Sequence, residues 1–216
     1  MLLFDAKVLD ESCRYKVYDA SPHILGREPL PQAILDHLPV DELEEAGAIF
    51  DRAERTRSIL SKFILRSELS RELGIAPASL GFAKGRYGKP LLFEPVSNLR
   101  FNVSHSGNFI AIAISPTDVG IDIEKHRVIE DAEGMVYDYF CSDEHQWLIE
   151  SGVENRMPSF FTLWTRKEAL LKAIGTGFST PLNRISVMDG NIIAGQWRLE
   201  SIVAPQGYSA AVSWQV

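Results

Sequence analysis

Apolar and polar positions follow a helical spacing in two long stretches of this chain. Between residues 41 and 74, apolar side chains recur at steps of three and four residues. This spacing predicts one long helix, with a break near Gly47 and an end at Gly74. Residues 160–177, FFTLWTRKEALLKAIGTG, predict a second long helix closed by glycines, and a shorter helix is expected to begin at a Ser142 cap. The apolar positions of the first stretch are Phe50, Ala53, Ile59, Leu60, Phe63, Ile64 and Leu69.

Three mid-chain runs favour β-strands. They are LRFNV, FIAIAIS and VGIDIE, separated by the turn sequences SHSGN and PTD. An antiparallel meander is their simplest arrangement, and the tail predicts three further strands in ISVM, GQWRLESIVA and GYSAAVSWQV. The segment FAKGRYGKP predicts a loop, because Pro90 cannot occupy an ordinary central strand. The residues before LPQAILDHL show no clear pattern.

The order of these elements indicates two similar halves. A helical stretch followed by two or three strands occurs twice, as in a duplicated α+β unit. Residues 115–118 are the mid-chain point where strands give way to helices, so we expect subdomains at 1–115 and 116–216. A crevice between two packed halves is a common place for a ligand.

Composition excludes several classes of protein. With 22 Lys and Arg against 29 Asp and Glu, the formal charge is −7, which gives no overall reason to bind nucleic acid or an anionic membrane. No stretch approaches the roughly 18 apolar residues of a membrane span. The two cysteines lie far apart in sequence, and the first residues include acids without a long apolar run. We therefore expect a cytoplasmic protein that is not exported.

Two acids in VGIDIE are the first candidates for chemistry. In a strand, Asp122 and Glu124 share one face while the aliphatic residues share the other, with the two Cα atoms roughly 6 to 7 Å apart. Carboxylates this close repel each other unless a cation compensates, and oxygen ligands of this kind suit Mg²⁺. The alternative is a strand with one solvated acidic face.

The helix WTRKEALLK adds a third acid and two lysines. Lys167 falls within the apolar arc of the helix, whereas Glu168 and Lys172 lie together along its edge. One interpretation is a surface ion pair beside a snorkelling lysine whose amine reaches water. The other is that this edge faces a charged ligand, so that Glu168 supplies a carboxylate and the lysines neutralise phosphate.

Other polar clusters could hold an anion. Ser104, His105 and Ser106 in FNVSHSGN are expected in a tight turn whose hydroxyls, imidazole and N–H groups could hold phosphate oxygens, or which has no catalytic role. No histidine or cysteine spacing indicates a structural zinc site. Two basic clusters, which are either solvated faces or anion contacts, are Lys84, Arg86 and Lys89, and Arg52, Arg55 and Arg57.

Taken in order, the motifs YGKP, FNVSHS, VGIDIE and WTRKEALLK resemble the 4'-phosphopantetheinyl transferases of the surfactin-synthetase-activating type. The strong matching runs from about Arg86 to Lys172. The resemblance implies an α+β pseudo-dimer with coenzyme A and Mg²⁺ in the cleft between two similar subdomains. It also implies a monomer that transfers 4'-phosphopantetheine to a serine of an apo acyl or peptidyl carrier protein and releases adenosine 3',5'-bisphosphate.

The resemblance assigns roles to particular residues. Asp122, Glu124 and Glu168 match the family's metal-binding acids, and Glu168 is also a proposed base for the carrier serine, directly or through water. Lys172 and His105 are expected to join Glu168 in catalysis.

Six matches concern coenzyme A. Ser104 and His105 match phosphate contacts, while Lys167 and Lys172 match lysines near the pyrophosphate. Arg57 and Lys89 match groups that hold the nucleotide end. Relatives often carry extra basic residues ahead of the long helix, whereas this chain has DELEE at residues 41–45.

Two other functions agree with the same residues. One is a different metal-dependent phosphoryl or nucleotidyl transferase that uses the three acids. The other is a non-catalytic module that binds coenzyme A or a carrier protein.

Overall fold

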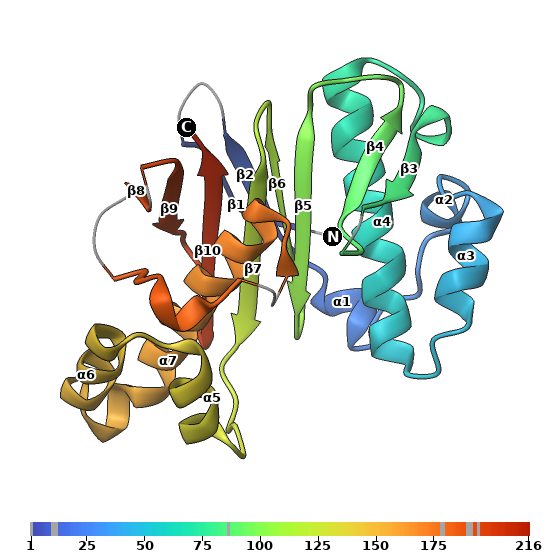
Figure 1. Ribbon diagram of the computed structural model, residues 1–216. Helices are drawn as coiled ribbons and strands as arrows, with labels where there is room; N and C mark the ends of the chain where they lie inside the picture. Colours follow the sequence, from blue (N-terminus) through green and yellow to red (C-terminus); the bar gives the residue numbers. More distant parts are fainter. Residues whose placement is uncertain (1, 10–12, 86, 178–179, 189–191, 194) are drawn as a thin grey trace.

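The computed structural model describes residues 2–9, 13–85, 87–177, 180–188, 192–193 and 195–216, and its two main sheets each lie against one long helix (Figure 1). The first sheet has the antiparallel order β1-β2-β6-β5. The second has the antiparallel order β7-β10-β9-β8. The strands of the first sheet are β1 (Leu2–Val8), β2 (Arg14–Asp19), β5 (Arg100–Ser106) and β6 (Phe109–Ser115). Those of the second are β7 (Val119–Lys125), β8 (Ile192–Ile193), β9 (Trp197–Ser201) and β10 (Tyr208–Gln215).

The helices confirm most of the predicted pattern. The predicted break near Gly47 divides α3 from α4, and α4 ends at Gly74, whose positive φ of 67° closes the helix. Asp51 starts α4 by accepting a hydrogen bond from the Glu54 N–H at 2.7 Å. Phe50, assigned above to the apolar side of this helix, instead precedes it and is fully exposed. The helices before the mid-chain strands are α1 (Ser21–Ile24), α2 (Gln32–Leu35), α3 (Val40–Gly47) and α4 (Arg52–Leu73).

The second half contains α5 (Ala132–Tyr139), α6 (Ser142–Glu150) and α7 (Gly152–Ile174). The cap of α6 is Cys141 rather than Ser142, and its backbone N–H donates to the Glu144 carboxylate at 2.7 Å. Helix α7 starts eight residues before the predicted stretch and contains Pro158. None of the described helices is long and apolar enough to cross a bilayer.

Large and small side chains alternate along β6 because its two faces pack against different layers. In β6, Ile110, Ile112 and Ile114 pack on the α4 side, while Ala111 and Ala113 face the second sheet. Small side chains there let the two sheets approach, and the aliphatic residues of β7 fill the layer between them. The opposite face of β7 is therefore turned toward α7.

Three predictions about strands were wrong. VGIDIE does not complete a meander, because β7 pairs along its whole length with β10. ISVM is not a strand, since the Val187 N–H donates to the Glu144 side chain and the Ile185 carbonyl accepts from Lys167. The segment predicted as a loop is flanked by a two-stranded ribbon, β3 (Gly81–Lys84) and β4 (Pro90–Glu94), in which Pro90 begins an outer strand.

Each main sheet draws all its strands from one side of the mid-chain break, which makes the fold α+β with two similar halves. The subdomain limits 1–115 and 116–216 stay a prediction. Strands β1 and β2 had no clear signal, although Tyr15 and Val17 alternate into the core between the sheets.

Candidate active site

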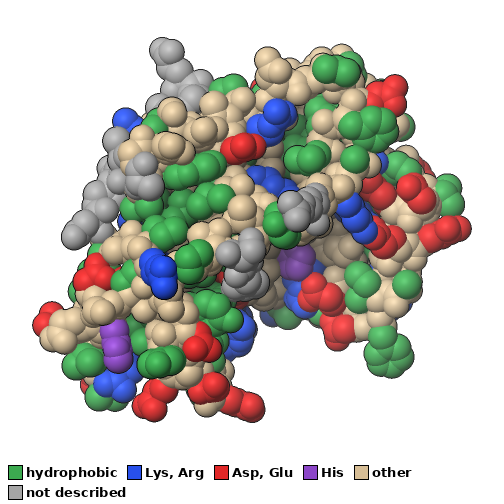
Figure 2. Space-filling model, in the orientation of Figure 1, with side chains coloured by type: hydrophobic (Ala, Val, Ile, Leu, Met, Phe, Trp, Pro, Cys, Tyr) green, Lys and Arg blue, Asp and Glu red, His purple; other side chains and the backbone are tan. Residues whose placement is uncertain are grey.

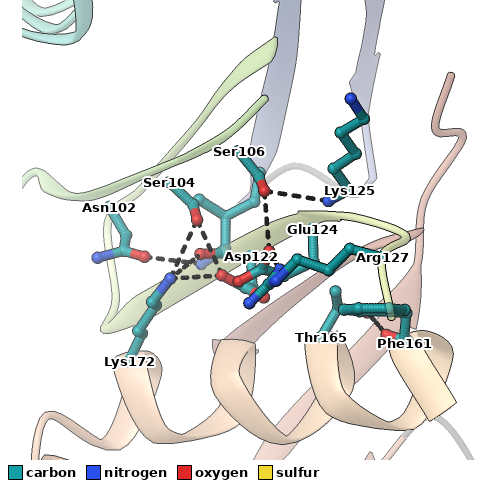
Figure 3. Close-up of polar contacts among 11 residues, drawn as sticks. Asn102, Ser104, Ser106, Asp122, Glu124, Lys125, Arg127, Phe161, Thr165 and Lys172 are labelled. Atoms are coloured by element: carbon teal, nitrogen blue, oxygen red, sulfur yellow. Dashed lines mark hydrogen bonds and ion pairs between the residues drawn. The ribbon is translucent and has the colours of Figure 1, made fainter. Parts of the chain in front are cut away.

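Strands β5 and β7 lie side by side without a backbone ladder, and side chains join them (Figure 3). Asn102 accepts from the Ile121 N–H at 2.9 Å, and the Ser104 hydroxyl donates to Asp122 at 2.8 Å. These contacts advance in the same direction along both strands, so a polar face of β5 meets the acidic face of β7.

This geometry corrects the interpretation of SHSGN as a tight turn. Ser104, His105 and Ser106 are the last residues of β5, and only Gly107 and Asn108 form the turn. Because side chains alternate along a strand, the two serines reach β7 while His105 points to the other side.

Asp122 is the most enclosed acid of the site, with 3% of its surface exposed. Its Oδ1 accepts from the Lys172 ammonium at 2.6 Å and from the Ser104 hydroxyl. Its Oδ2 is buried and has no hydrogen-bond partner among the described residues. A buried carboxylate oxygen without a donor is costly, so this atom is available for a cation.

Glu124 lies two residues further along the same face and is partly exposed. Its Oε2 accepts from the Ser106 hydroxyl at 2.8 Å and from Arg127 Nη1 at 3.1 Å. The solvated acidic face considered as the alternative is therefore wrong for Asp122 and only partly true for Glu124.

Glu168 on α7 is the third acid. Burial raises its pKa to about 7, the Asp122 and Glu124 charges act in the same direction, and Lys172 opposes them. Near neutral pH this carboxyl is therefore only partly ionised.

A pocket of about 240 Å³ lies between the two halves, and of the three acids Glu168 lines it. The first half contributes Asn102 and the loop before β4, and the second half contributes Glu168, Lys172 and the glycines after α7. On the face shown in Figure 2, cationic, acidic and histidine side chains gather around the hollow between the halves.

Gly120 sets the distance between the acidic strand and α7. A Cβ at this position would lie 2.1 Å from the Ala169 carbonyl oxygen and 2.3 Å from the Ala173 nitrogen. Glycine therefore allows α7 to approach β7 closely enough for Lys172 to reach Asp122.

The fit of a metal rests on oxygen atoms. Among the described residues, no group of three or more His, Cys, Asp or Glu side chains is already arranged to hold a metal ion. The buried Asp122 Oδ2 nevertheless has no hydrogen-bond partner, so a bound cation could compensate its charge. A set of ligands made only of carboxylate oxygens suits Mg²⁺. Asp122, Glu124 and Glu168 therefore fit the ion chemically.

Lys167 lies on the other side of α7. Its ammonium is fully buried, forms an ion pair with Glu144 at 2.7 Å, and donates to the Leu182 and Ile185 carbonyls at 2.7 Å each. The structure thus places Lys167 outside the pocket, in the core between α6 and α7, and its amine does not reach water. The apolar arc noted in the sequence is the core-facing side of the helix.

Of the two residues predicted to hold the nucleotide end, Arg57 does not line the pocket. Lys89 lines the pocket, but its ammonium donates to the Val119 and Lys172 carbonyls at 2.8 and 2.6 Å, and burial lowers its pKa. Arg57 on α4 donates to the Gly107 carbonyl at 3.0 Å and pairs with Glu54.

His105 faces the start of α4. Its ring nitrogen lies 3.9 Å from Glu54, and burial lowers its pKa, so the ring is neutral near pH 7. Lys84 pairs with Glu45 at 3.1 Å, and Arg86 lies outside the described residues.

Sequence reasoning missed Asn102, Gly120 and Arg127. For Asn102 a signal existed, because Asn102, Ser104 and Ser106 alternate along the same strand as the acids do along theirs. No local signal distinguished Arg127 from other basic residues.

Comparisons with known proteins agree with this architecture. Residues 118–213 match the 4'-phosphopantetheinyl transferase superfamily, and residues 30–117 match the family described as 4'-phosphopantetheinyl transferase, N-terminal. The 4'-phosphopantetheinyl transferase gsp of Aneurinibacillus migulanus is 38% identical over 128 residues, which span 59% of this chain and 52% of that protein.

Two other relatives are matched over more of their length. The 4'-phosphopantetheinyl transferase HetI of a Nostoc species is 37% identical over 72% of this chain and 69% of its own. A 4'-phosphopantetheinyl transferase of Bacillus subtilis is 28% identical over 90% of this chain and 82% of its own. The surfactin-type resemblance is supported too, because the transferase Sfp of Bacillus subtilis is 27% identical over 74% of this chain. With two α+β halves, a polar pocket between them and these relatives, the chain belongs to the 4'-phosphopantetheinyl transferase superfamily.

Proposed function

We propose that this chain transfers 4'-phosphopantetheine from coenzyme A to a serine of an apo acyl or peptidyl carrier protein. The serine oxygen forms a bond to the β-phosphorus, and the bond between that phosphorus and the bridging oxygen breaks. Adenosine 3',5'-bisphosphate leaves, and the serine proton passes to a base. The observation that carries the proposal is the buried Asp122 carboxylate, which has one unpartnered oxygen and holds Lys172, a residue that lines the pocket together with Glu168.

Glu168 is the proposed base. A carboxyl with a pKa of about 7 is partly ionised at neutral pH and still basic enough to take a proton in the transition state. A proton transfer of this kind contributes roughly 10²- to 10⁴-fold to a rate.

Lys172 and Ser104 both contact Oδ1 of Asp122. The Lys172 ammonium is fixed by Asp122 and lies 3.1 Å from the Ser104 hydroxyl, so both groups are oriented before a phosphate arrives. The Ser104 hydroxyl gives its hydrogen to Asp122, so it orients the pair, and the fixed Lys172 ammonium is the group that stabilises charge developing on phosphate oxygens during transfer. Asp122, Glu124 and Glu168 would hold Mg²⁺, which when bound neutralises pyrophosphate charge.

The remaining contacts belong to the coenzyme. A neutral His105 can donate one hydrogen bond to a phosphate oxygen, and Arg57 can give charge at the nucleotide end. Lys89 has one N–H beyond the two that its carbonyl partners take. Lys167 does not belong to this set, because its ammonium is fully buried against Glu144 and it does not line the pocket.

The direct test is intact-mass measurement of several apo carrier proteins after incubation with the purified chain, coenzyme A and Mg²⁺. We expect a gain of one phosphopantetheine on at least one carrier, with bisphosphate released in equal amount. Glu168→Gln and Asp122→Asn should lower the rate by at least about 100-fold. Glu133→Gln, an acid on α5 outside the pocket, serves as the matched control and should keep the rate.

Two outcomes would favour the alternatives. Cleavage of a nucleoside triphosphate without any carrier mass gain would indicate another phosphoryl or nucleotidyl transferase. Coenzyme A binding that survives Glu168→Gln without turnover in the parent protein would indicate a binding module. We further propose that the protein acts as a cytoplasmic monomer, since both sides of the pocket come from one chain.

A further inference from the structure

Glu124 is already neutralised by a cation of the chain itself. Arg127 follows β7 by two residues, and Figure 3 shows its side chain reaching back to the Glu124 carboxylate. Its Nη1 donates to Oε2 at 3.1 Å, and the Ser106 hydroxyl donates to the same oxygen at 2.8 Å. A guanidinium and a divalent cation both need the negative charge of this carboxylate, so they compete for it.

The surroundings of Arg127 allow its side chain to move away from the Glu124 carboxylate. Its side chain is 61% exposed, and an exposed pair of this kind is weak. Its guanidinium carbon lies 5.7 Å from the centre of the Phe161 ring, within the range of a cation–π contact. A hollow of about 490 Å³, lined by Glu124, Arg127, Phe161 and Trp164 among others, gives the side chain room next to that ring.

Asp122 differs in this respect. Its lysine partner is held at 2.6 Å and less exposed, and its second oxygen is unpartnered. A cation can therefore reach Asp122 without displacing a protein group from Oδ2, whereas a cation that binds both oxygens of Glu124 displaces Arg127 from Oε2.

We propose that Arg127 is an exchangeable counter-ion of Glu124. It neutralises the carboxylate while no divalent cation is bound, and when a cation takes its place it releases Glu124 Oε2 and keeps its contact with the Phe161 ring. This inference rests on the proposed role of Glu124 as a metal ligand. In this structure Oε2 of Glu124 is occupied by Arg127 and Ser106.

The test measures cation binding rather than turnover. The full chain without coenzyme A is titrated with Mn²⁺, and free ion is counted by electron paramagnetic resonance. Arg127→Ala should lower the Kd by about three- to fivefold, because the competing ion pair is lost. Arg127→Lys, which keeps a charge without the planar guanidinium, should fall between the two.

Lys125→Ala is the matched control. It removes one positive charge from the end of the same strand, but the Lys125 side chain points away from Glu124 (Figure 3). Its Kd should stay within about 1.5-fold of the parent value. An equal tightening in both variants would show a general effect of charge and overturn the exchange.

A double-mutant cycle completes the test. In a Glu124→Gln background, Arg127→Ala should cause no further change in the Kd, because the shared partner is gone. A tightening that persists there, or an unchanged Kd in Arg127→Ala alone, would refute the proposal. If the parent protein binds no Mn²⁺, both this exchange and the magnesium part of the proposed function fail. The carrier mass gain, measured separately, still decides the transferase activity.

Discussion

Helix α7 carries two lysines five residues apart whose surroundings are opposite in kind. Lys167 is fully buried, and its ammonium has three protein acceptors, one of them the equally buried Glu144. Lys172 is partly exposed and pairs with an acid whose second oxygen has no partner. The charged groups around Lys167 all have partners within the protein, whereas the pair of Lys172 and Asp122 leaves Asp122 Oδ2 without one.

The difference shows how a structural charge can be told from a site charge. Glu144 uses both oxygens on backbone N–H groups, at the start of α6 and at Val187, so the buried pair ties two segments to α7. The Asp122 carboxylate has one oxygen bound and one open. Burial alone does not distinguish Glu144 from Asp122, since both are buried. The difference is that every carboxylate oxygen of Glu144 has a hydrogen-bond donor, whereas one oxygen of Asp122 has none.

The largest expected effect tests the buried pair of Lys167 and Glu144. Lys167→Met leaves the buried Glu144 charge without its counter-ion and should lower the free energy of unfolding by about 3 to 5 kcal/mol. Urea denaturation measures the loss, and Lys167→Met combined with Glu144→Gln should recover part of it. Lys172→Met should cost less, about 1 kcal/mol, because Asp122 keeps the Ser104 hydroxyl. Equal losses for the two lysines would break the comparison.

A second prediction concerns the close approach of Gly120 to α7, which brings Lys172 near Asp122. Gly120→Ala forces its Cβ against the α7 backbone and should lower the free energy of unfolding by about 1 to 3 kcal/mol. Transfer activity should fall as well, since Lys172 and Glu168 move away from Asp122. Gly47→Ala is the control, because nothing lies within 4 Å of its added Cβ. Full activity in Gly120→Ala would show that the close approach is not required.

The smallest effect concerns the pH dependence of stability without metal. The folded-state pKa of Glu168, about 7, is above the ordinary value of 4.5, so the folded state holds this proton more tightly than the unfolded chain. The resulting stabilisation is fully present below pH 4.5 and is lost as the pH rises through 7. Between pH 6 and 8.5 the parent protein should lose about 1 kcal/mol more than Glu168→Gln.

Urea titrations in a chelator, at both pH values, measure this difference. Glu133→Gln should follow the parent protein, since its carboxyl lies outside the pocket. Parallel losses in the parent and in Glu168→Gln would mean that another group causes the pH dependence.

Much of the architecture could be predicted from local pattern. The helix spacing located α4 and its end at Gly74, and the alternation of VGIDIE placed its acids on one face of a strand. These features depend on neighbours within a few residues, so one sequence contains them. Strands β1 and β2 and the partner of β7 could not be predicted, because strand pairing depends on residues far away in the chain.

By itself, the sequence determined which chemical groups are available: three acids, the serines of β5 and the lysines of α7. Only the tertiary structure decided which of them meet. The sequence placed Lys167 within the apolar arc and Lys172 at its edge, but only the packed structure gives Lys167 its partner Glu144 on α6 and brings Lys172 to Asp122. The close approach at Gly120 buries Asp122, and burial raises the pKa of Glu168. Desolvation and hydrogen-bond completeness are properties of the packed chain, and they separate a site from a scaffold.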